Sequence, residues 1–194
     1  MESLPQMLHD EAVLASKYLK EGKVILYPTD TIWGLGCSLE SPAALDRIYH
    51  IKNRPPTKSP ILLVNSIEML KLYSGRIHPR IETLLLLHNR PLTVIYTNPV
   101  GLPLHVLNQD GSIAIRICKD PFCQKMIEFL NQPIISTSAN LSGEPPPKNF
   151  TEISESILKK VDHTVLYRQK DLSPTEASTI IRYDDEGEII IVRP

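Results

Sequence analysis

A cationic loop is the first stretch of this chain that could do chemistry. The segment KNRPPTKSP contains Lys52, Arg54 and Lys58 and no acidic residue. Cations at the C-terminal end of a helix can simply complement its dipole, and prolines can simply end it. That role needs only one or two charges, however, and the three prolines restrict the conformations of the loop. Guanidinium and ammonium groups held in this way bind phosphate oxygens well. The segment therefore favours a polyphosphate site.

Two other segments offer neutral hydrogen-bonding groups. The segment YPTDTIWGLG places Thr31 shortly after a predicted buried strand, and the segment STSANLSGEPPPK contains Ser138 and Asn140. A turn that ends a strand would account for the first segment, but the second has more hydroxyl and amide groups than a turn needs. Such groups can fix a zwitterionic or sugar-like ligand without adding charge.

One arginine lies within an apolar alternation. In the segment SIAIRI, which begins at Ser112, Arg116 interrupts the alternating apolar residues that are typical of a strand. An arginine that faces the core needs an anionic partner, whereas one that faces outward is simply solvated. The sequence leaves both orientations open for Arg116, and the same ambiguity holds for Ser178 and Arg193 near the end of the chain.

Several enzyme classes are excluded by missing motifs. The chain has no HExxH zinc motif, no GxSxG nucleophile elbow, no GxxxxGK[ST] phosphate loop and no GxGxxG dinucleotide motif. Its three cysteines form no CxxC pair and its six histidines are scattered, so we expect no resident metal site. Cations and neutral polar groups without an evident nucleophile suit a reaction that depends on positioning and charge stabilisation, such as phosphoryl or nucleotidyl transfer.

Length and composition indicate one globular domain. The 194 residues are 42% hydrophobic and 22% charged, which is ordinary for a globular chain. The formal net charge of −1 gives no general attraction for nucleic acid or anionic lipid, so any anion site must be local. No apolar run approaches the roughly 20 residues of a membrane span, and the start, MESLPQMLHDEAVL, is unlike a signal peptide. We therefore expect a cytoplasmic protein that does not bind membranes.

Short apolar runs alternate with amphipathic segments along the chain. We expect helices over residues 8–20, 41–52, 66–73, 79–88, 120–130 and 150–160, and strands over 24–27, 61–64, 92–96, 113–117, 134–137, 164–167, 178–183 and 188–193. This alternation predicts a single α/β domain built on a twisted, open, mixed sheet with helices on both faces. Ligands of such sheets bind beyond strand ends, which is where the polar segments fall.

The order of these segments resembles the YrdC/TsaC-like family of threonylcarbamoyl-AMP synthases. The resemblance rests on YPTDTIWGLG, IKNRPPTKSPILLV, PLTVI, GSIAIRI, ISTSANLSGEP and EASTII, and it covers roughly residues 24–193. Its hallmark is a K-x-R motif, from Lys52 to Arg54, paired with a distant S-x-N motif, from Ser138 to Asn140. We expect these two motifs to meet at one pocket.

The resemblance implies a reaction and the residues that carry it. L-Threonine, bicarbonate and ATP, which brings Mg²⁺, would give L-threonylcarbamoyl-AMP and pyrophosphate for the threonylcarbamoyl-adenosine modification of tRNA. The residues that would bind threonine are Thr31, Arg116, Ser138 and Ser178. Those that would bind ATP are Lys52, Arg54, Lys58, Ser112, Asn140, Lys148 and Arg193. The catalytic residues would be Lys52, Arg54, Ser138 and Asn140.

The resemblance also implies one YrdC-like domain over residues 1–194, with a core from about residue 8 and no C-terminal accessory domain. Expected partners are tRNA or a tRNA-modifying transferase complex, and the expected state is a monomer or weak dimer. Family members often carry WPGPLT where this chain has HNRPLT, and many have a histidine where Val64 and Asn65 stand. Part of the threonine pocket is therefore expected to differ.

Two other functions stay open at this point. A paralogue with the same fold could act on a different adenylated or carbamoylated substrate, since intact motifs argue against an inactive site without identifying threonine. An RNA-binding module could use the same basic residues through salt-dependent phosphate contacts. The near-neutral charge and the 6% of aromatic residues make the RNA-binding reading the weaker of the two.

Overall fold

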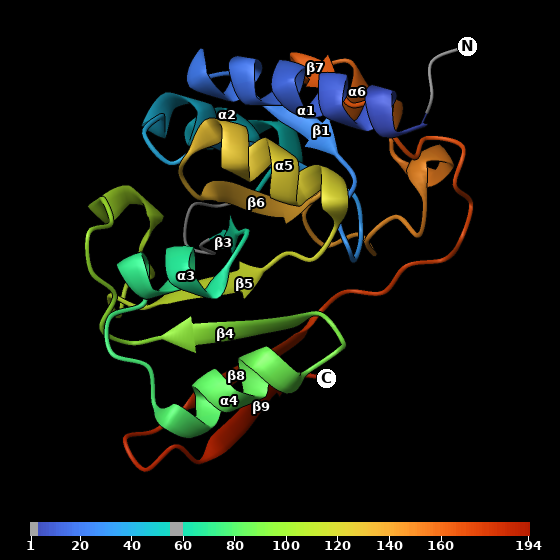
Figure 1. Cartoon of the computed structure of the whole chain (residues 1–194). Helices are drawn as coiled ribbons and strands as arrows, with labels where there is room; N and C mark the ends of the chain where they lie inside the picture. Colours follow the sequence, from blue (N-terminus) through green and yellow to red (C-terminus); the bar gives the residue numbers. More distant parts are fainter. Residues whose placement is uncertain (1–3, 55–59) are drawn as a thin grey trace.

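The strands form one open mixed sheet (Figure 1). The computed structural model describes residues 4–54 and 60–194. The strands within these residues are β1 (Ile25–Tyr27), β2 (Gly34–Ser38), β3 (Ile61–Val64), β4 (Leu92–Tyr96), β5 (Ile113–Ile117), β6 (Ile134–Ser138), β7 (His163–Thr164), β8 (Thr179–Tyr183) and β9 (Ile189–Arg193). They lie in the order β7-β1-β2-β6-β3-β5-β4-β8-β9. The pairs β1–β7, β3–β5 and β4–β8 are parallel and the others antiparallel, so the expected mixed sheet is confirmed.

Helices cover both faces of this sheet (Figure 1). The α-helices of the described residues are α1 (Leu4–Lys20), α2 (Pro42–Lys52), α3 (Ile67–Tyr73), α4 (Pro79–Leu87), α5 (Pro121–Leu130) and α6 (Glu155–Leu158). Successive strand residues point to opposite faces. In β6, Ile134 belongs to the apolar cluster that includes α1 and α5, whereas Ile135 belongs to the cluster that includes α2. The predicted α/β architecture is therefore confirmed.

Helix α2 begins and ends as its sequence predicts. Ser41 caps its first turn by accepting a hydrogen bond from the backbone N–H of Ala44 at 3.3 Å, and Pro42 occupies the first helical position. At the other end Asn53 adopts the left-handed conformation, with φ of 50°. The turn at Asn53 ends the helix and directs Arg54 toward the sheet.

Strand β2 is the main difference from the expected elements. The sequence predicts no strand between residues 28 and 60, because Gly34 and Gly36 weaken the pattern. In the structure Gly36 makes room for the ring of Tyr27 on the neighbouring strand, since a Cβ at this position would lie 2.7 Å from a ring carbon. The Tyr27 hydroxyl then donates to Ser136 Oγ on β6 at 2.7 Å. The glycines therefore serve packing within the sheet.

The predicted helix over residues 150–160 is also shorter in the structure. It is replaced by a 3-10 turn, Phe150–Glu152, and by α6, because Ile153 is extended and Ser154 caps a new helix. The strand predicted over residues 164–167 is the shorter β7, His163–Thr164, which starts one residue earlier and ends three residues earlier. Within residues 4–54 and 60–194, no helix combines the length and the apolar character needed to cross a membrane.

Candidate active site

The K-x-R and S-x-N segments meet where α2 ends beside β6. The ammonium of Lys52 donates to the backbone oxygens of Ser138 and Asn140, the latter at 2.6 Å. The guanidinium of Arg54 donates to Thr137 Oγ1 at 2.8 Å. Two segments more than 80 residues apart are thus joined by their side chains. The expectation that the two motifs meet is confirmed.

A cavity of about 230 Å³ lies beside this junction. Six of the eleven candidate residues line it, namely Thr31, Arg54, Arg116, Ser138, Ser178 and Arg193. They come from the turn after β1, the end of α2, and strands or strand ends of the sheet. The cavity therefore combines guanidinium groups with neutral hydroxyl groups.

Arg116 faces the interior, which decides the orientation that the sequence left open. Its side chain is 4% exposed, and its guanidinium donates to Thr31 Oγ1 at 2.7 Å and more weakly to Thr29 Oγ1 at 3.4 Å. Thr29 Oγ1 also accepts from the backbone N–H of Thr31 at 3.0 Å, so the turn and the arginine are one network. Arg116 Nε is buried and has no hydrogen-bond partner among the described residues. An anionic ligand could supply that partner.

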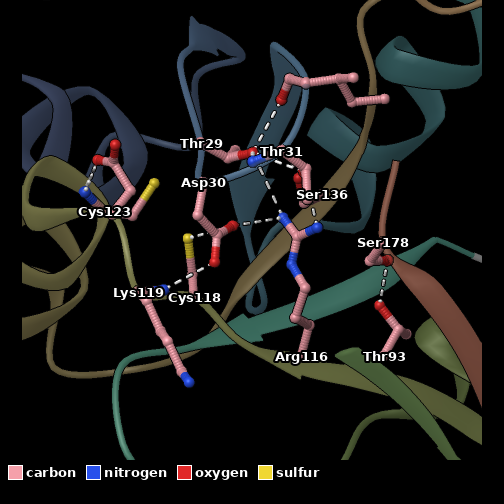
Figure 2. Close-up of polar contacts among 12 residues, drawn as sticks. Thr29, Asp30, Thr31, Thr93, Arg116, Cys118, Lys119, Cys123, Ser136 and Ser178 are labelled. Carbon is pink, nitrogen blue, oxygen red and sulfur yellow. Dashed lines mark hydrogen bonds and ion pairs between the residues drawn. The ribbon is translucent and has the colours of Figure 1, made fainter. Parts of the chain in front are cut away.

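Asp30 balances part of this positive charge. Figure 2 shows Thr29, Asp30 and Thr31 gathered around the guanidinium of Arg116, with Asp30 Oδ1 at 3.4 Å from Nη2. The same carboxylate accepts hydrogen bonds from Cys118 Sγ at 3.2 Å and from the backbone N–H of Lys119 at 2.9 Å. Asp30 is therefore shared among three donors, and its charge does not neutralise the cavity.

A second arginine and a hydroxyl pair form the opposite wall. Arg193 donates to the backbone oxygen of Ser178 at 2.7 Å, and burial together with the nearby Arg116 lowers its pKa. Ser178 Oγ lies 2.7 Å from Thr93 Oγ1, a contact drawn in Figure 2. Three arginines, Arg54, Arg116 and Arg193, line the cavity, and its described lining contains no carboxylate, so the cavity favours an anion.

Lys52 lies behind the cavity rather than on the described part of its wall. Its side chain is among the largest that are almost wholly buried, at 2% exposed. Burial, with a smaller contribution from the positive charge of Arg54, lowers the pKa of Lys52 to about 7. The carbonyl oxygens of Ser138 and Asn140 compensate part of the cost of burying the ammonium. Lys52 thus fixes the S-x-N segment in place.

The contribution of Lys52 to the free energy of unfolding should rise with pH above 7. The folded protein releases this proton near pH 7, whereas the unfolded chain holds it up to the ordinary value of 10.5. At this one site the unfolded state therefore binds more protons throughout the interval, so the contribution of Lys52 to stability increases with pH. A plot of the free energy of urea unfolding at pH 7, 8.5 and 10 should have a more positive slope for the natural protein than for Lys52→Met, which cannot titrate there. Equal slopes would contradict the burial of a titrating ammonium.

Asn140 lies at the edge of the site. Its side-chain amide donates to the backbone oxygens of Leu141 at 3.0 Å and Glu144 at 2.6 Å. Its Oδ1 atom is buried without a hydrogen-bond partner in the described residues. Asn140 therefore orders the loop after β6 and keeps one acceptor that a ligand could use.

Three other candidates lie outside the described cavity wall. Ser112 is buried and donates to Asp110 Oδ1 at 2.6 Å, so its hydroxyl stabilises the turn before β5. Lys148 is exposed, and Lys58 falls outside the residues that the structure describes. The ATP-binding roles of these residues stay predictions. No cluster of His, Cys, Asp and Glu suited to a metal occurs within the described ranges.

Three threonines that were not among the candidate residues also line the cavity, namely Thr29, Thr93 and Thr137. Thr29 could have been found because it lies two residues before Thr31 and flanks the same aspartate. Thr93 lies directly opposite Arg116 in the β4–β5 ladder, a register that no local pattern reveals. Thr137 lies in β6 between Ser136 and Ser138, which also line the cavity, so its place in this run of hydroxyl residues was a signal that could have identified it.

Comparison with known proteins assigns the family. A family model named for Sua5, YciO and YrdC, and described as "Telomere recombination", matches residues 17–194. The chain belongs to the Sua5/YciO/YrdC family. One curated family relative, the threonylcarbamoyl-AMP synthase of Vibrio campbellii, is 35% identical over 144 residues, which are 73% of this chain and 78% of that protein. The expectation of an enzyme in this family is therefore confirmed.

Solved structures of family members have the same fold. P. abyssi Sua5 complexed with L-threonine superposes with a TM-score of 0.83 at 26% identity, over 96% of this chain and 54% of that chain. The chain thus spans about half the length of that Sua5. E. coli YciO superposes with a TM-score of 0.81 at 26% identity, over 95% of this chain and 89% of that chain.

Proposed function

We propose that this enzyme makes L-threonylcarbamoyl-AMP and pyrophosphate from L-threonine, bicarbonate and ATP. The observation that carries the proposal is the buried guanidinium of Arg116, which faces a hydroxyl-lined cavity and has one N–H without a partner among the described residues. The V. campbellii relative is named threonylcarbamoyl-AMP synthase, and a structure of P. abyssi Sua5 is described as a complex with L-threonine. Both names agree with an amino-acid ligand in this cavity.

Threonine would bind through its carboxylate to Arg116. A guanidinium pairs with a carboxylate in a fixed, two-pronged geometry, and a buried pair of this kind excludes water. The hydroxyl groups of Thr31, Ser138 and Ser178 lie around the cavity and would hold the amino group and the side-chain hydroxyl. The ligand would thus be fixed by one charge pair and several neutral contacts.

ATP would lie toward Arg54 and Arg193 and extend beyond the enclosed space. The cavity of about 230 Å³ is smaller than the roughly 300–1,000 Å³ that sites for larger ligands occupy, so it suits threonine and the reacting phosphate rather than the whole nucleotide. Arg54 is the cavity-lining member of the K-x-R motif, with Lys52 bracing the adjoining segment. Lys58, Ser112, Asn140 and Lys148 stay candidates for the outer part of the nucleotide.

The proposed chemistry needs no nucleophilic side chain. The threonine amino group attacks bicarbonate and gives an N-carboxylate with loss of water. A carboxylate oxygen then forms a bond to the α-phosphorus of ATP, the bond to the β-phosphate bridge breaks, and pyrophosphate leaves. Arg54 and Arg193 would stabilise the negative charge on the phosphoryl oxygens, and Mg²⁺ would arrive with ATP as part of the substrate. The product would then serve threonylcarbamoyl transfer to tRNA in the cytoplasm.

Product detection tests this proposal most directly. Purified protein incubated with ATP, threonine and bicarbonate should give threonylcarbamoyl-adenylate by mass spectrometry, together with pyrophosphate. Reactions with serine or carbamoyl phosphate in place of threonine distinguish a paralogue that acts on another substrate. The proposal fails if no reaction with threonine exceeds the reaction without it. Tight, salt-sensitive binding of tRNA without ATP turnover would instead support an RNA-binding module.

A further inference from the structure

Arg168 adopts a backbone conformation that arginine rarely takes. It follows β7 and has φ of 65°, in the left-handed region. Such a conformation costs a non-glycine residue about 1 kcal/mol or more unless the surroundings compensate. Here the side chain compensates, since its guanidinium donates to the backbone oxygen of Thr29 at 3.0 Å, to Asp120 Oδ2 at 2.9 Å and to Asp171 Oδ2 at 3.1 Å.

These contacts connect Arg168 to two rigid points. Asp120 is almost wholly buried and caps α5, where its Oδ1 accepts from the backbone N–H groups of Phe122 at 2.9 Å and Cys123 at 3.1 Å. Its second oxygen accepts from Arg168, so the guanidinium is anchored to the start of a helix. From there Arg168 reaches the Thr29 carbonyl, in the turn that follows β1.

Thr29 is also the residue that links this turn to Arg116. Its hydroxyl lies 2.9 Å from Thr31 Oγ1, and Thr31 Oγ1 in turn accepts from Arg116 at 2.7 Å. Arg168 thus holds the main chain of Thr29, and the side chain of Thr29 contacts Arg116. The two arginines do not touch the same atom, and Thr29 is the bridge between them.

We propose that Arg168 is a positioning residue for the amino-acid substrate, acting through the main chain of Thr29. This inference rests on the proposed function, because it assigns the carboxylate of the substrate to Arg116. Arg168 keeps the Thr29–Thr31 hydroxyl pair in register with Arg116, so that the guanidinium is oriented before the substrate arrives. Its effect should therefore fall on amino-acid binding and leave ATP binding unchanged.

The turn has other supports, which separate positioning from folding. Cys123 Sγ donates to the Pro28 oxygen at 3.2 Å, and the Lys119 backbone N–H donates to Asp30 Oδ2 at 2.9 Å. Neither contact involves Arg168. Loss of Arg168 should therefore loosen the Thr29 carbonyl without unfolding the segment.

The variant Arg168→Gly tests the inference. Glycine adopts φ near 65° without strain, so this substitution removes the guanidinium but still favours the left-handed backbone conformation at position 168. We expect the KM for threonine to rise by about 10-fold or more, which is the factor that one hydrogen bond to a charged group typically supplies. The KM for ATP and the kcat at saturating threonine should stay within about 2-fold. If Arg168→Gly does not fold, Arg168→Asn should give the same result, since asparagine also tolerates positive φ and its side chain is too short to reach the Thr29 oxygen.

Asp171→Asn is the matched control. This substitution weakens the contact between Arg168 and residue 171, which is the most exposed of the three contacts of Arg168. It changes no contact of the turn that contains Thr29, so the KM for threonine should not change. Calorimetric titration of threonine provides a readout without turnover. Weaker threonine binding in Arg168→Gly but not in Asp171→Asn supports the inference, and equal binding in all three proteins overturns it. If the natural protein itself binds no threonine, the proposed function fails as well.

Discussion

Replacing Arg116 with methionine should reduce threonine-dependent pyrophosphate release by ~100-fold or more, the typical cost of removing one buried electrostatic group from an active site. Methionine approximates the length of the arginine stem but has no donors for a carboxylate. Threonine binding, followed by calorimetry, should fall with the rate, because the same guanidinium would hold the ground state. Asp30 would keep the hydrogen bonds from Cys118 and Lys119, so the local fold should persist.

Arg182→Met is the matched control for this experiment. Arg182 is also a strand arginine, on β8, but its side chain is exposed. Its loss should leave both the rate and threonine binding close to those of the natural protein. Near-normal activity in Arg116→Met would contradict the assignment of the substrate carboxylate to this residue, whatever the control shows.

The fold could be predicted from local patterns because most elements have clear beginnings and periodicities. Ser41 and Pro42 mark the start of α2, and Asp120 caps α5 in the same way. Strand β2 could not be predicted, because Gly36 lacks a side chain for a reason that lies on the adjacent strand, the ring of Tyr27. The role of a glycine in a strand can therefore be predicted only when the residue beside it on the adjacent strand is known.

The site could be predicted in outline but not in its internal arrangement. The sequence indicated that the cationic and hydroxyl-rich segments would meet, and they do, through a contact of Arg54 with Thr137, which was not among the candidate residues. The position of Lys52 could not be inferred, because its ammonium points to two backbone oxygens that only the course of the chain after β6 provides. The contact between Arg168 and Thr29 spans 139 residues, and no periodicity or motif connects them.

Arg54→Ala should separate nucleotide chemistry from threonine binding. We expect pyrophosphate release to fall by ~100-fold or more, because Arg54 would stabilise charge on the transferred phosphoryl group. Threonine binding should change little, since the network of Arg116, Thr29 and Thr31 does not include Arg54. The measurements are the rate of pyrophosphate release, the KM for ATP and calorimetric binding of threonine.

The contrast between Arg54→Ala and Arg116→Met is more informative than either variant alone. If one cavity holds both substrates, Arg54→Ala should lose turnover but still bind threonine. Arg116→Met should lose both turnover and threonine binding. Arg90→Ala, which removes an exposed arginine before β4, is the control for a general loss of positive charge. A loss of threonine binding in Arg54→Ala equal to that in Arg116→Met would mean that the two guanidinium groups hold the same ligand, and the division of the cavity into an amino-acid part and a phosphate part would be wrong.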